Sequence, residues 1–314
     1  KKEKSEQKRK KMIVQKVFHQ SESTGIHGHM AKTKRQIIED LKLIDVVVEI
    51  LDARIPVASQ NPDIGKWIEG KQKLFVLNKC DLASESDNKK WIQYFEKNGI
   101  PAVLVDSNSG KGIDNSLKRI NSIYNENSEK YANKGRIGKS IRVMILGIPN
   151  VGKSSFINRV TKKNSMQVGN KPGVTRQKQW VRISENIELL DTPGVLWPKF
   201  ESEEVGLKLA YTGTIKDDVL QTIEIGFSLL KYLISSYKEN LIERYKLDEN
   251  KIDEILENDI EENEKALEIM DEIGRKRGAL MSGGYIDQEK VAKIILDDFR
   301  SGRLGRITLE SPEM

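Results

Sequence analysis

The chain has 314 residues, of which 37% are hydrophobic, enough for one large or two ordinary domains with a sizeable core. The single cysteine, Cys80, excludes an internal disulfide framework and zinc sites built on several thiolates, and the three histidines, all near the N-terminus, argue against a multi-histidine metal site. The 53 basic and 47 acidic residues leave a net charge of +6, a small excess that favours an anionic partner.

The first stretch, residues 1–11, is rich in lysine and lacks apolar periodicity, so we expect residues 1–20 to form a disordered basic tail. A basic arm that grips nucleic acid is the alternative interpretation of the same residues. No run is apolar and long enough to cross a membrane, and no secretion signal is evident. The sequence therefore predicts a cytoplasmic protein without a membrane partner.

From residue 28 the pattern is helical, with apolar residues spaced for one buried face at Ile37, Ile38, Leu41 and Ile44. Apolar runs predict strands at 45–51, 73–77, 102–105 and 140–146, and helices are predicted at 89–98 and from residue 155. This alternation predicts an α/β fold, a mostly parallel sheet with helices on both faces.

Two further strands are predicted at 180–183 and 187–190, and beyond them the pattern changes. From residue 203 it is helical, including an amphipathic run at 218–237 and an acidic run at 248–272. The sequence therefore predicts an α/β domain over residues 21–200 and a small all-helical domain over residues 201–314.

Residues 147–154 form the pattern G-x-x-x-x-G-K-S between a predicted strand and a predicted helix. Glycines let the backbone turn tightly around a phosphate, and the N–H groups at a helix start attract anionic oxygens. Lys153 is predicted to reach the terminal phosphates, and Ser154 to ligate Mg²⁺. The residues predicted to bind a nucleotide here are Asn150, Val151, Gly152, Lys153, Ser154 and Ser155.

The segment Asn78-Lys79-Cys80-Asp81 directly follows a predicted strand, at the edge where ligands bind in open α/β sheets. The Asn78 amide is predicted to bond the guanine edge, and the Asp81 carboxylate to accept from the ring N–H and the exocyclic amine. Adenine lacks that amine and would leave the carboxylate unsatisfied, so the pair favours guanine. Ser107 and Asn108, after the next strand, are predicted to close over the base with their backbone N–H groups.

A third segment, Asp191-Thr192-Pro193-Gly194, also follows a predicted strand. Asp191 is predicted to orient a Mg²⁺-bound water, and the Gly194 N–H to meet the γ-phosphate. Thr175 lies between this segment and the phosphate loop and is predicted to be a second hydroxyl ligand of Mg²⁺. A solvated loop threonine is the alternative interpretation of Thr175.

These elements resemble those of the translation-factor-like GTPases, but the base-reading segment here precedes the phosphate loop. That rotated order is the mark of the circularly permuted GTPases. Within them, residues 28–35 (GHMAKTKR), 51–62 (LDARIPVASQNP) and 299–310 (FRSGRLGRITLE) resemble the ribosome-assembly GTPases of the YlqF/RbgA type. The resemblance implies a circularly permuted P-loop GTPase domain followed by a helical domain, with GTP or GDP and Mg²⁺ as ligands.

Most such GTPases position the attacking water with a glutamine just after D-x-x-G, where this chain has Val195. The resemblance implies that His29, in the G-H-M motif, supplies the missing catalytic group. The alternative is that His29 only caps or packs against the first helix. Asn150 resembles the asparagine that ligates a monovalent cation in potassium-stimulated members, which implies a K⁺ site. A solvent-facing loop asparagine is the alternative there.

The resemblance also implies the partner, an immature large (50S) ribosomal subunit with its rRNA and ribosomal proteins. The protein would be a monomeric, ribosome-stimulated GTPase that binds the subunit through the helical domain and is released on hydrolysis. The arginines within 274–278 and 299–310 suit a phosphate backbone, although such charge runs are as often solvated faces. The alternative function is a GTP-gated RNA-binding module in which hydrolysis is incidental. Asn78 and Asp81 disfavour an ATP-using enzyme.

Overall fold

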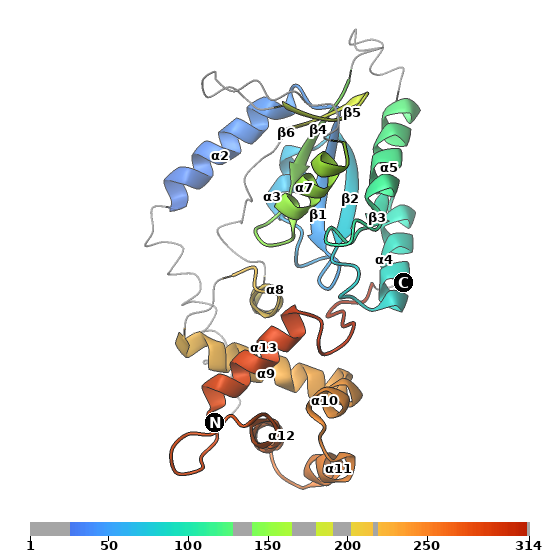
Figure 1. Cartoon of the computed structure of the whole chain (residues 1–314). Helices are drawn as coiled ribbons and strands as arrows, with labels where there is room; N and C mark the ends of the chain where they lie inside the picture. Colours follow the sequence, from blue (N-terminus) through green and yellow to red (C-terminus); the bar gives the residue numbers. More distant parts are fainter. Residues whose placement is uncertain (1–25, 128–139, 165–179, 191–201, 216–218, 313–314) are drawn as a thin grey trace. The chain divides into compact units, whose positions relative to one another are not determined.

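The computed structural model describes residues 26–127, 140–164, 180–190, 202–215 and 219–312, which fall into two compact units (Figure 1). We call them the α/β unit, made of the described residues up to 190 together with those from Thr308 onward, and the helical unit, made of those from 202 to Ile307.

The α/β unit is built on one six-stranded sheet with the order β3-β2-β1-β4-β6-β5. All neighbours in it are parallel except the pair β5 and β6. Every residue of the central strand β1 is buried, as is typical of a parallel strand covered on both faces. The strands are β1 (Val46–Asp52), β2 (Gln72–Asn78), β3 (Ala102–Leu104), β4 (Ile141–Leu146), β5 (Trp180–Ser184) and β6 (Ile187–Leu190).

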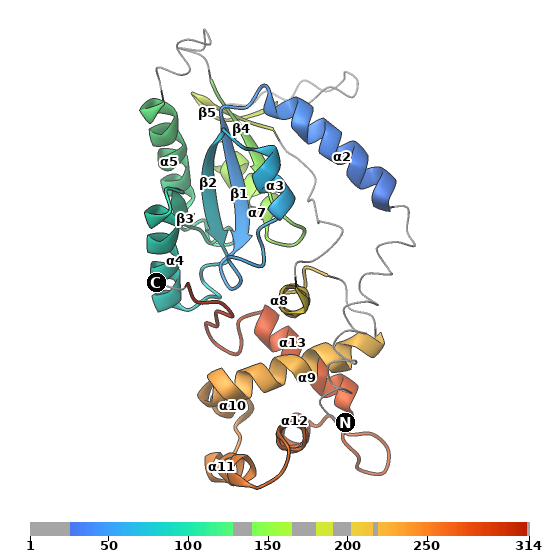
Figure 2. The same ribbon diagram turned by 180° about the vertical axis from the view of Figure 1, so that it is seen from behind.

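Five described helices cover this sheet: α2 (Ile26–Leu41), α3 (Pro62–Trp67), α4 (Glu85–Lys97), α5 (Ile113–Glu126) and α7 (Lys153–Asn164). In Figure 1 α7 lies in front of the sheet, and in Figure 2 α3 does, so these two helices cover opposite faces. Helix α5 packs against β1, β2 and α7. The prediction of a sheet with helices on both faces is therefore confirmed.

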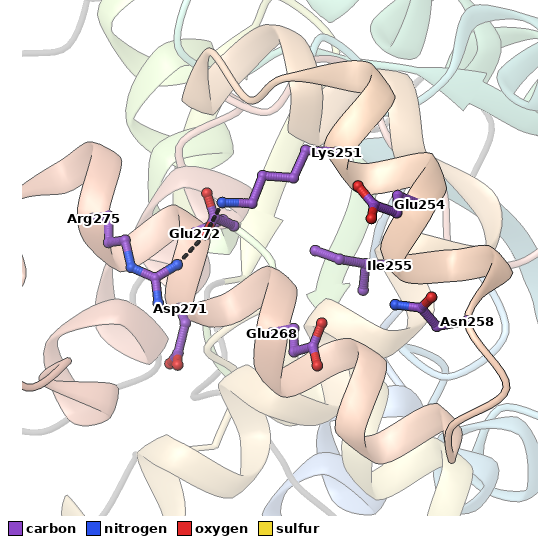
Figure 3. A pocket seen from close by; sticks show the side chains of 8 residues that line it. All are labelled: Lys251, Glu254, Ile255, Asn258, Glu268, Asp271, Glu272 and Arg275. Carbon is purple, nitrogen blue, oxygen red and sulfur yellow. Dashed lines mark hydrogen bonds and ion pairs between the residues drawn. The ribbon is translucent and has the colours of Figure 1, made fainter.

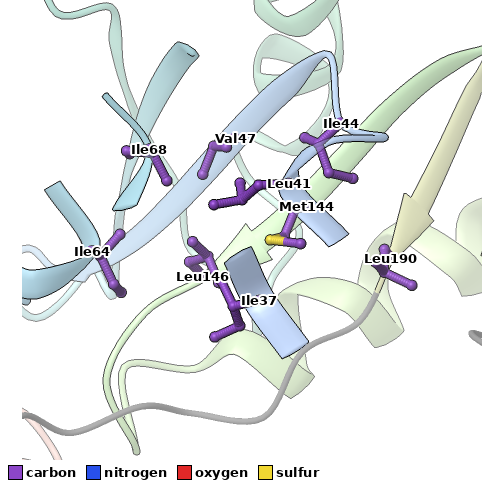
Figure 4. Packing of buried hydrophobic residues seen from close by; sticks show 9 residues of the cluster. All are labelled: Ile37, Leu41, Ile44, Val47, Ile64, Ile68, Met144, Leu146 and Leu190. Carbon is purple, nitrogen blue, oxygen red and sulfur yellow. The ribbon is translucent and has the colours of Figure 1, made fainter. Parts of the chain in front are cut away.

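A buried apolar cluster fastens α2 and α3 to the sheet (Figure 4). Side chains from both helices belong to the same cluster as one residue of β1 and two alternate residues of β4, which share a face because successive residues of a strand point to opposite faces. The members are Ile37, Leu41, Ile44, Val47, Ile64, Ile68, Met144, Leu146 and Leu190. A second buried cluster, with Trp91 and Phe95 of α4 at its centre, covers the ends of β1 and β2.

The helical unit contains α8 (Glu203–Tyr211), α9 (Val219–Ser236), α10 (Lys238–Tyr245), α11 (Glu249–Glu257), α12 (Glu262–Arg277) and α13 (Gln288–Arg300). Helices α9 and α13 pack closely against each other, because Gly226 has no side chain: a Cβ there would lie 2.6 Å from the Cβ of Ala292. None of the described helices is both long and apolar enough to cross a membrane.

The acidic run at 248–272 is not one helix but parts of two. Helix α11 begins after Asp248, whose side chain accepts from the N–H groups of Asn250 and Lys251, and the chain leaves the helix at Asn258, where ψ is 143°. Helix α12 then starts after Glu261.

The predicted strands agree with the observed ones to within one or two residues at each end.

The C-terminal residues 308–312 differ from the predicted domain limits, which placed them in the helical domain. They pack on the α/β unit, beside α4 in Figures 1 and 2. The indole Nε1 of Trp91 donates to the Glu310 carbonyl at 3.0 Å, and the Leu309 N–H donates to the Arg54 carbonyl at 2.8 Å. Residues far apart in sequence thus complete the same unit.

Candidate functional site

The loops after β1, β2, β3 and β4 meet at one edge of the sheet, because these strands are parallel and their carboxyl ends point the same way. They contain the predicted base-reading and phosphate-binding segments. The segment after β6 begins at residue 191, which lies outside the described residues. The site is therefore built from four loops and the start of α7.

The phosphate loop turns sharply after β4, and two of its glycines are required by their surroundings. Gly147 has φ +150° and a Cβ there would lie 2.6 Å from the Ile50 carbonyl oxygen. Gly152 has φ +94° and a Cβ there would lie 2.2 Å from a side-chain nitrogen of Asn78. Helix α7 begins at the next residue, so the N–H groups of its first turn face the loop and favour an anion.

Asn78, at the end of β2, joins the phosphate loop to the loop after β3. Its Nδ2 donates to the Val151 carbonyl at 2.8 Å, and its Oδ1 accepts from the Ser107 N–H at 3.1 Å and from the Ser107 hydroxyl at 2.8 Å. The side chain is only 2% exposed. Asn78 thus holds two nucleotide loops together, and the base contact predicted for it would use its remaining N–H.

Lys79 links the phosphate loop to the loop after β1. Its Nζ donates to the Asn150 carbonyl at 2.7 Å and to the Asp52 carboxylate at 2.9 Å. Arg54 meets the same carboxylate through Nε at 2.9 Å and through a terminal nitrogen at 2.8 Å. Burial by itself would raise the pKa of the Asp52 carboxyl, but the Arg54 and Lys79 cations hold that pKa well below its usual range.

The loop after β3 is ordered by its own carboxylate. Asp106 accepts from the N–H groups of Asn108 at 2.8 Å and of Ser109 at 3.3 Å. Arg159 of α7 donates through Nε to the Ser107 carbonyl at 3.1 Å. A base approaching here would compete with Asp106 for the Asn108 N–H, and with Asn78 for the Ser107 N–H.

The remaining predicted site residues fall into two groups. Among those described, Val151 is buried, Lys153 is partly buried, and Asp81, Asn150, Ser154 and Ser155 are exposed. His29 lies within α2, but its side chain is outside the described part of the structure, and Thr175, Asp191 and Gly194 lie outside it entirely. The contacts predicted for Thr175, Asp191 and Gly194 with Mg²⁺ and the γ-phosphate therefore stay predictions.

Sequence reasoning missed Asp52, Arg54 and Arg159 as parts of this site. Asp52 and Arg54 belong to the L-D-A-R run that ends β1, so a carboxylate at a strand's carboxyl end was the available signal. Arg159 is one of several basic residues on α7, and nothing in its spacing distinguishes it. Its partner is a backbone carbonyl, which has no sequence signature.

The described residues of this site are suited to binding a polyphosphate and do not form a metal site by themselves. The two glycines leave the backbone open where a Cβ would clash, and the start of α7 and Lys153 supply positive charge. Within the described ranges, no group of three His, Cys, Asp or Glu side chains could hold a metal ion. Of the predicted Mg²⁺ ligands, the hydroxyl of Ser154 is the one described, and it lies on the first turn of α7.

A separate pocket of about 300 Å³ lies between α11 and α12 of the helical unit (Figure 3). Glu272 pairs there with both Lys251 and Arg275. With Glu254, Glu268 and Asp271 the wall has more carboxylates than cations, so this pocket is unsuited to a phosphate.

Two of the arginines predicted to meet RNA, Arg300 and Arg303, are bonded within the helical unit. Arg300 donates to the carbonyls of Tyr211 at 3.0 Å and Ala210 at 2.8 Å. Arg303 pairs with the buried carboxylate of Asp298. The first arginine thus holds the end of α8 in place, and the second fixes the turn after α13.

Known proteins resemble this chain over most of its length. A protein family described as 50S ribosome-binding GTPase matches residues 142–272. Ribosome biogenesis GTPase A of Bacillus cereus is 44% identical over 286 residues, which cover 91% of this chain and 93% of that protein.

Two solved structures are similar in fold as well as in sequence. The GDP-bound structure of TM YlqF has a TM-score of 0.62 at 26% identity, covering 89% of this chain and all of that one. The GNP-bound structure of YlqF from T. maritima has a TM-score of 0.57 at 26% identity, covering 90% of this chain and 99% of that one.

Proposed function

The chain belongs to the family of ribosome biogenesis GTPase A, and from this premise we propose that it binds an immature large ribosomal subunit through its helical unit and leaves after hydrolysing GTP. The family makes it a GTPase that acts in ribosome biogenesis, with a circularly permuted GTPase domain followed by a helical domain. The observation that supports a single GTP site in these loops is the pair of hydrogen bonds by which Asn78 and Lys79, in the predicted base-reading segment, contact the phosphate loop.

For the base, we assign the reading of guanine to Asp81. Its exposed carboxylate stands three residues after the end of β2 and can accept from two N–H donors that guanine has and adenine lacks in that combination. Asn78 and Lys79 act beside it by holding the phosphate loop and the base loop at a fixed separation. Ser107 and Asn108 complete the base pocket when the nucleotide takes over their N–H groups.

We assign the binding of the nucleotide phosphates to the backbone N–H groups of residues 150–155 and to the Lys153 ammonium. Ser154, Thr175 and Asp191 would hold Mg²⁺, which when bound neutralises charge on the β- and γ-phosphates. The Asn150 side chain would ligate K⁺ beside them. Gly194 would meet the γ-phosphate and so make the segment from Asp191 sensitive to its loss.

For hydrolysis, we assign the positioning of water to His29. The transition state of phosphoryl transfer is loose, so a neutral imidazole that orients water is sufficient, and no strong base is needed. Val195 cannot hydrogen-bond water. We therefore expect slow turnover by the protein alone and faster turnover on the particle, where contacts with the subunit would bring His29 into place.

We assign the docking on the large ribosomal subunit to the loop between α12 and α13. It is a short hairpin, closed by a bridge between Leu280 and Ile286, and it exposes Leu280, Met281 and Tyr285, the last to 73%. Exposed aromatic side chains stack on unpaired RNA bases, and the basic end of α12, with Lys276 exposed, suits the phosphates beside them. This surface supports rRNA docking better than Arg300 and Arg303, which have internal partners.

The first experiment measures GTP turnover with and without large subunits, in potassium and in sodium, with ATP as the control. We expect strong stimulation by subunits in potassium and no turnover of ATP. His29→Ala should keep nucleotide binding and lose the stimulated turnover. Flat turnover under every condition, with GTP still bound, would leave the GTP-gated RNA-binding module as the better description.

The docking surface is tested by cosedimentation with large subunits in the presence of a non-hydrolysable GTP analogue. The double variant Tyr285→Ala, Lys276→Ala should lose binding while its own GTP turnover stays unchanged. Leu267→Ala, an exposed apolar residue of α12 that is 39% accessible, is the matched control and should bind normally. Equal binding by all three proteins would overturn the assignment of this loop.

A further inference from the structure

The last described segment of the α/β unit, Thr308–Glu310, lies between two loops at the edge of the sheet. Thr308 and Leu309 are buried, at 4% and 5% exposed. The Thr308 hydroxyl accepts from the Ser84 N–H at 2.9 Å, just before α4. We call Thr308–Glu310 the C-terminal strap.

The strap's carboxylate satisfies a turn that would otherwise lack acceptors. The Ser59 N–H donates to the Ile55 carbonyl at 2.9 Å, so residues 55–59 form a turn closed by a bond from residue 59 to residue 55. The first N–H groups of such a turn have no partner within it. Glu310 accepts from two of them, the Val57 N–H at 2.6 Å and the Ala58 N–H at 3.1 Å, as charge-assisted bonds to its carboxylate.

Hydrogen bonds connect residues 55–59 to Asp52. The Ser59 hydroxyl accepts from the Asp52 N–H at 3.0 Å, and the Leu309 N–H donates to the carbonyl of Arg54, whose guanidinium holds the Asp52 carboxylate. The same carboxylate accepts from Lys79, which reaches the Asn150 carbonyl of the phosphate loop. A continuous chain of hydrogen bonds therefore joins the strap to the nucleotide site.

We propose that the C-terminal strap is a positioning element of the nucleotide site: it fixes the loop after β1, and thereby the Lys79 ammonium and the phosphate loop, so that bound nucleotide is released slowly. The inference rests on the proposed assignment of these loops to GTP. The strap follows Ile307, the last residue of the helical unit, without a break in the chain.

The test is the rate at which a fluorescent GDP analogue leaves the full-length protein after excess GDP is added. Glu310→Ala should release it about threefold faster or more, the size of a coupling carried through packed and hydrogen-bonded groups. Glu310→Gln keeps one acceptor oxygen and should lie between Glu310→Ala and the unaltered chain. Glu96→Ala, an exposed glutamate on α4, is the control and should release the analogue at the normal rate.

Amide hydrogen exchange separates positioning from mere stability. Positioning requires Glu310→Ala to speed exchange at Val57 and Ala58 and also in the phosphate loop at residues 150–152. If exchange rises only at Val57 and Ala58 and GDP release is unchanged, the strap is a structural anchor and the proposal is overturned. Should Glu310→Ala fail to fold, Glu310→Gln carries the same comparison.

Binding by the unaltered protein separates a failure of the nucleotide site from a failure of the strap. If it does not bind the GDP analogue, the assignment of the nucleotide site fails first. If it binds the analogue and Glu310→Ala releases it no faster than Glu96→Ala, the site stands and the strap has no part in holding the nucleotide.

Discussion

Replacement of Asn78 by alanine tests the geometry of the site most directly. The change removes one donor and one acceptor that join the Val151 carbonyl to the N–H and hydroxyl of Ser107. Each of these three bonds contributes about 1 kcal/mol net, and the Ser107 donors would be left buried without an acceptor. We expect a loss of roughly 3 kcal/mol, or roughly 6–12 °C in the melting temperature of a unit of this size.

The same variant should bind GDP at least about tenfold more weakly, since the direct bonds from Asn78 to the Val151 carbonyl and to Ser107 are lost and the loops are held only through Lys79 and Arg159. Differential scanning fluorimetry and titration of a fluorescent GDP analogue measure the two effects. Asn98→Ala is the matched control: its Nδ2 donates to the Tyr94 carbonyl at an exposed helix end, so its loss should change stability little. If Asn78→Ala is no worse than Asn98→Ala in both assays, the bridging role is wrong.

Three further substitutions probe the same region. Gly152→Ala places a Cβ 2.2 Å from a side-chain nitrogen at φ +94° and should abolish nucleotide binding, whereas Gly65→Ala, in α3 with nothing within 4 Å, should not; equal binding by both would refute the steric argument. Asp52→Asn leaves the Arg54 guanidinium buried without its counter-charge and should cost about 3–5 kcal/mol in urea unfolding, so a cost below about 1 kcal/mol would contradict the pairing. Burial raises the pKa of Glu49 from 4.5 to about 7, so stability present below pH 4.5 is lost as pH rises through 7. Glu49→Gln should therefore unfold like the unaltered protein near pH 5 and be more stable near pH 8, by up to about 3 kcal/mol, and parallel pH profiles would exclude this.

Local patterns were sufficient for much of the fold. A continuous apolar run predicts a buried strand wherever it lies, so the strands of the sheet could be located to within one or two residues. Helix α3 was not predicted, because six residues are too few to show a periodicity and Gly65 lies within them. Its start signal was nevertheless present: Asn61 accepts from the Asp63 N–H, and Pro62 occupies the first turn.

The phosphate-binding role of residues 147–154 and the base-reading role of Asp81 could be predicted from the sequence alone, because each prediction depends on residue types at fixed short spacing after a strand. Only the tertiary structure decided how the loops are held. Asn78 meets a carbonyl 73 positions away, and Glu310 meets an N–H 253 positions away. Hydrogen bonds require atoms within about 3 Å and in line, and such distances between remote residues are fixed only when the sheet and its covering helices have packed.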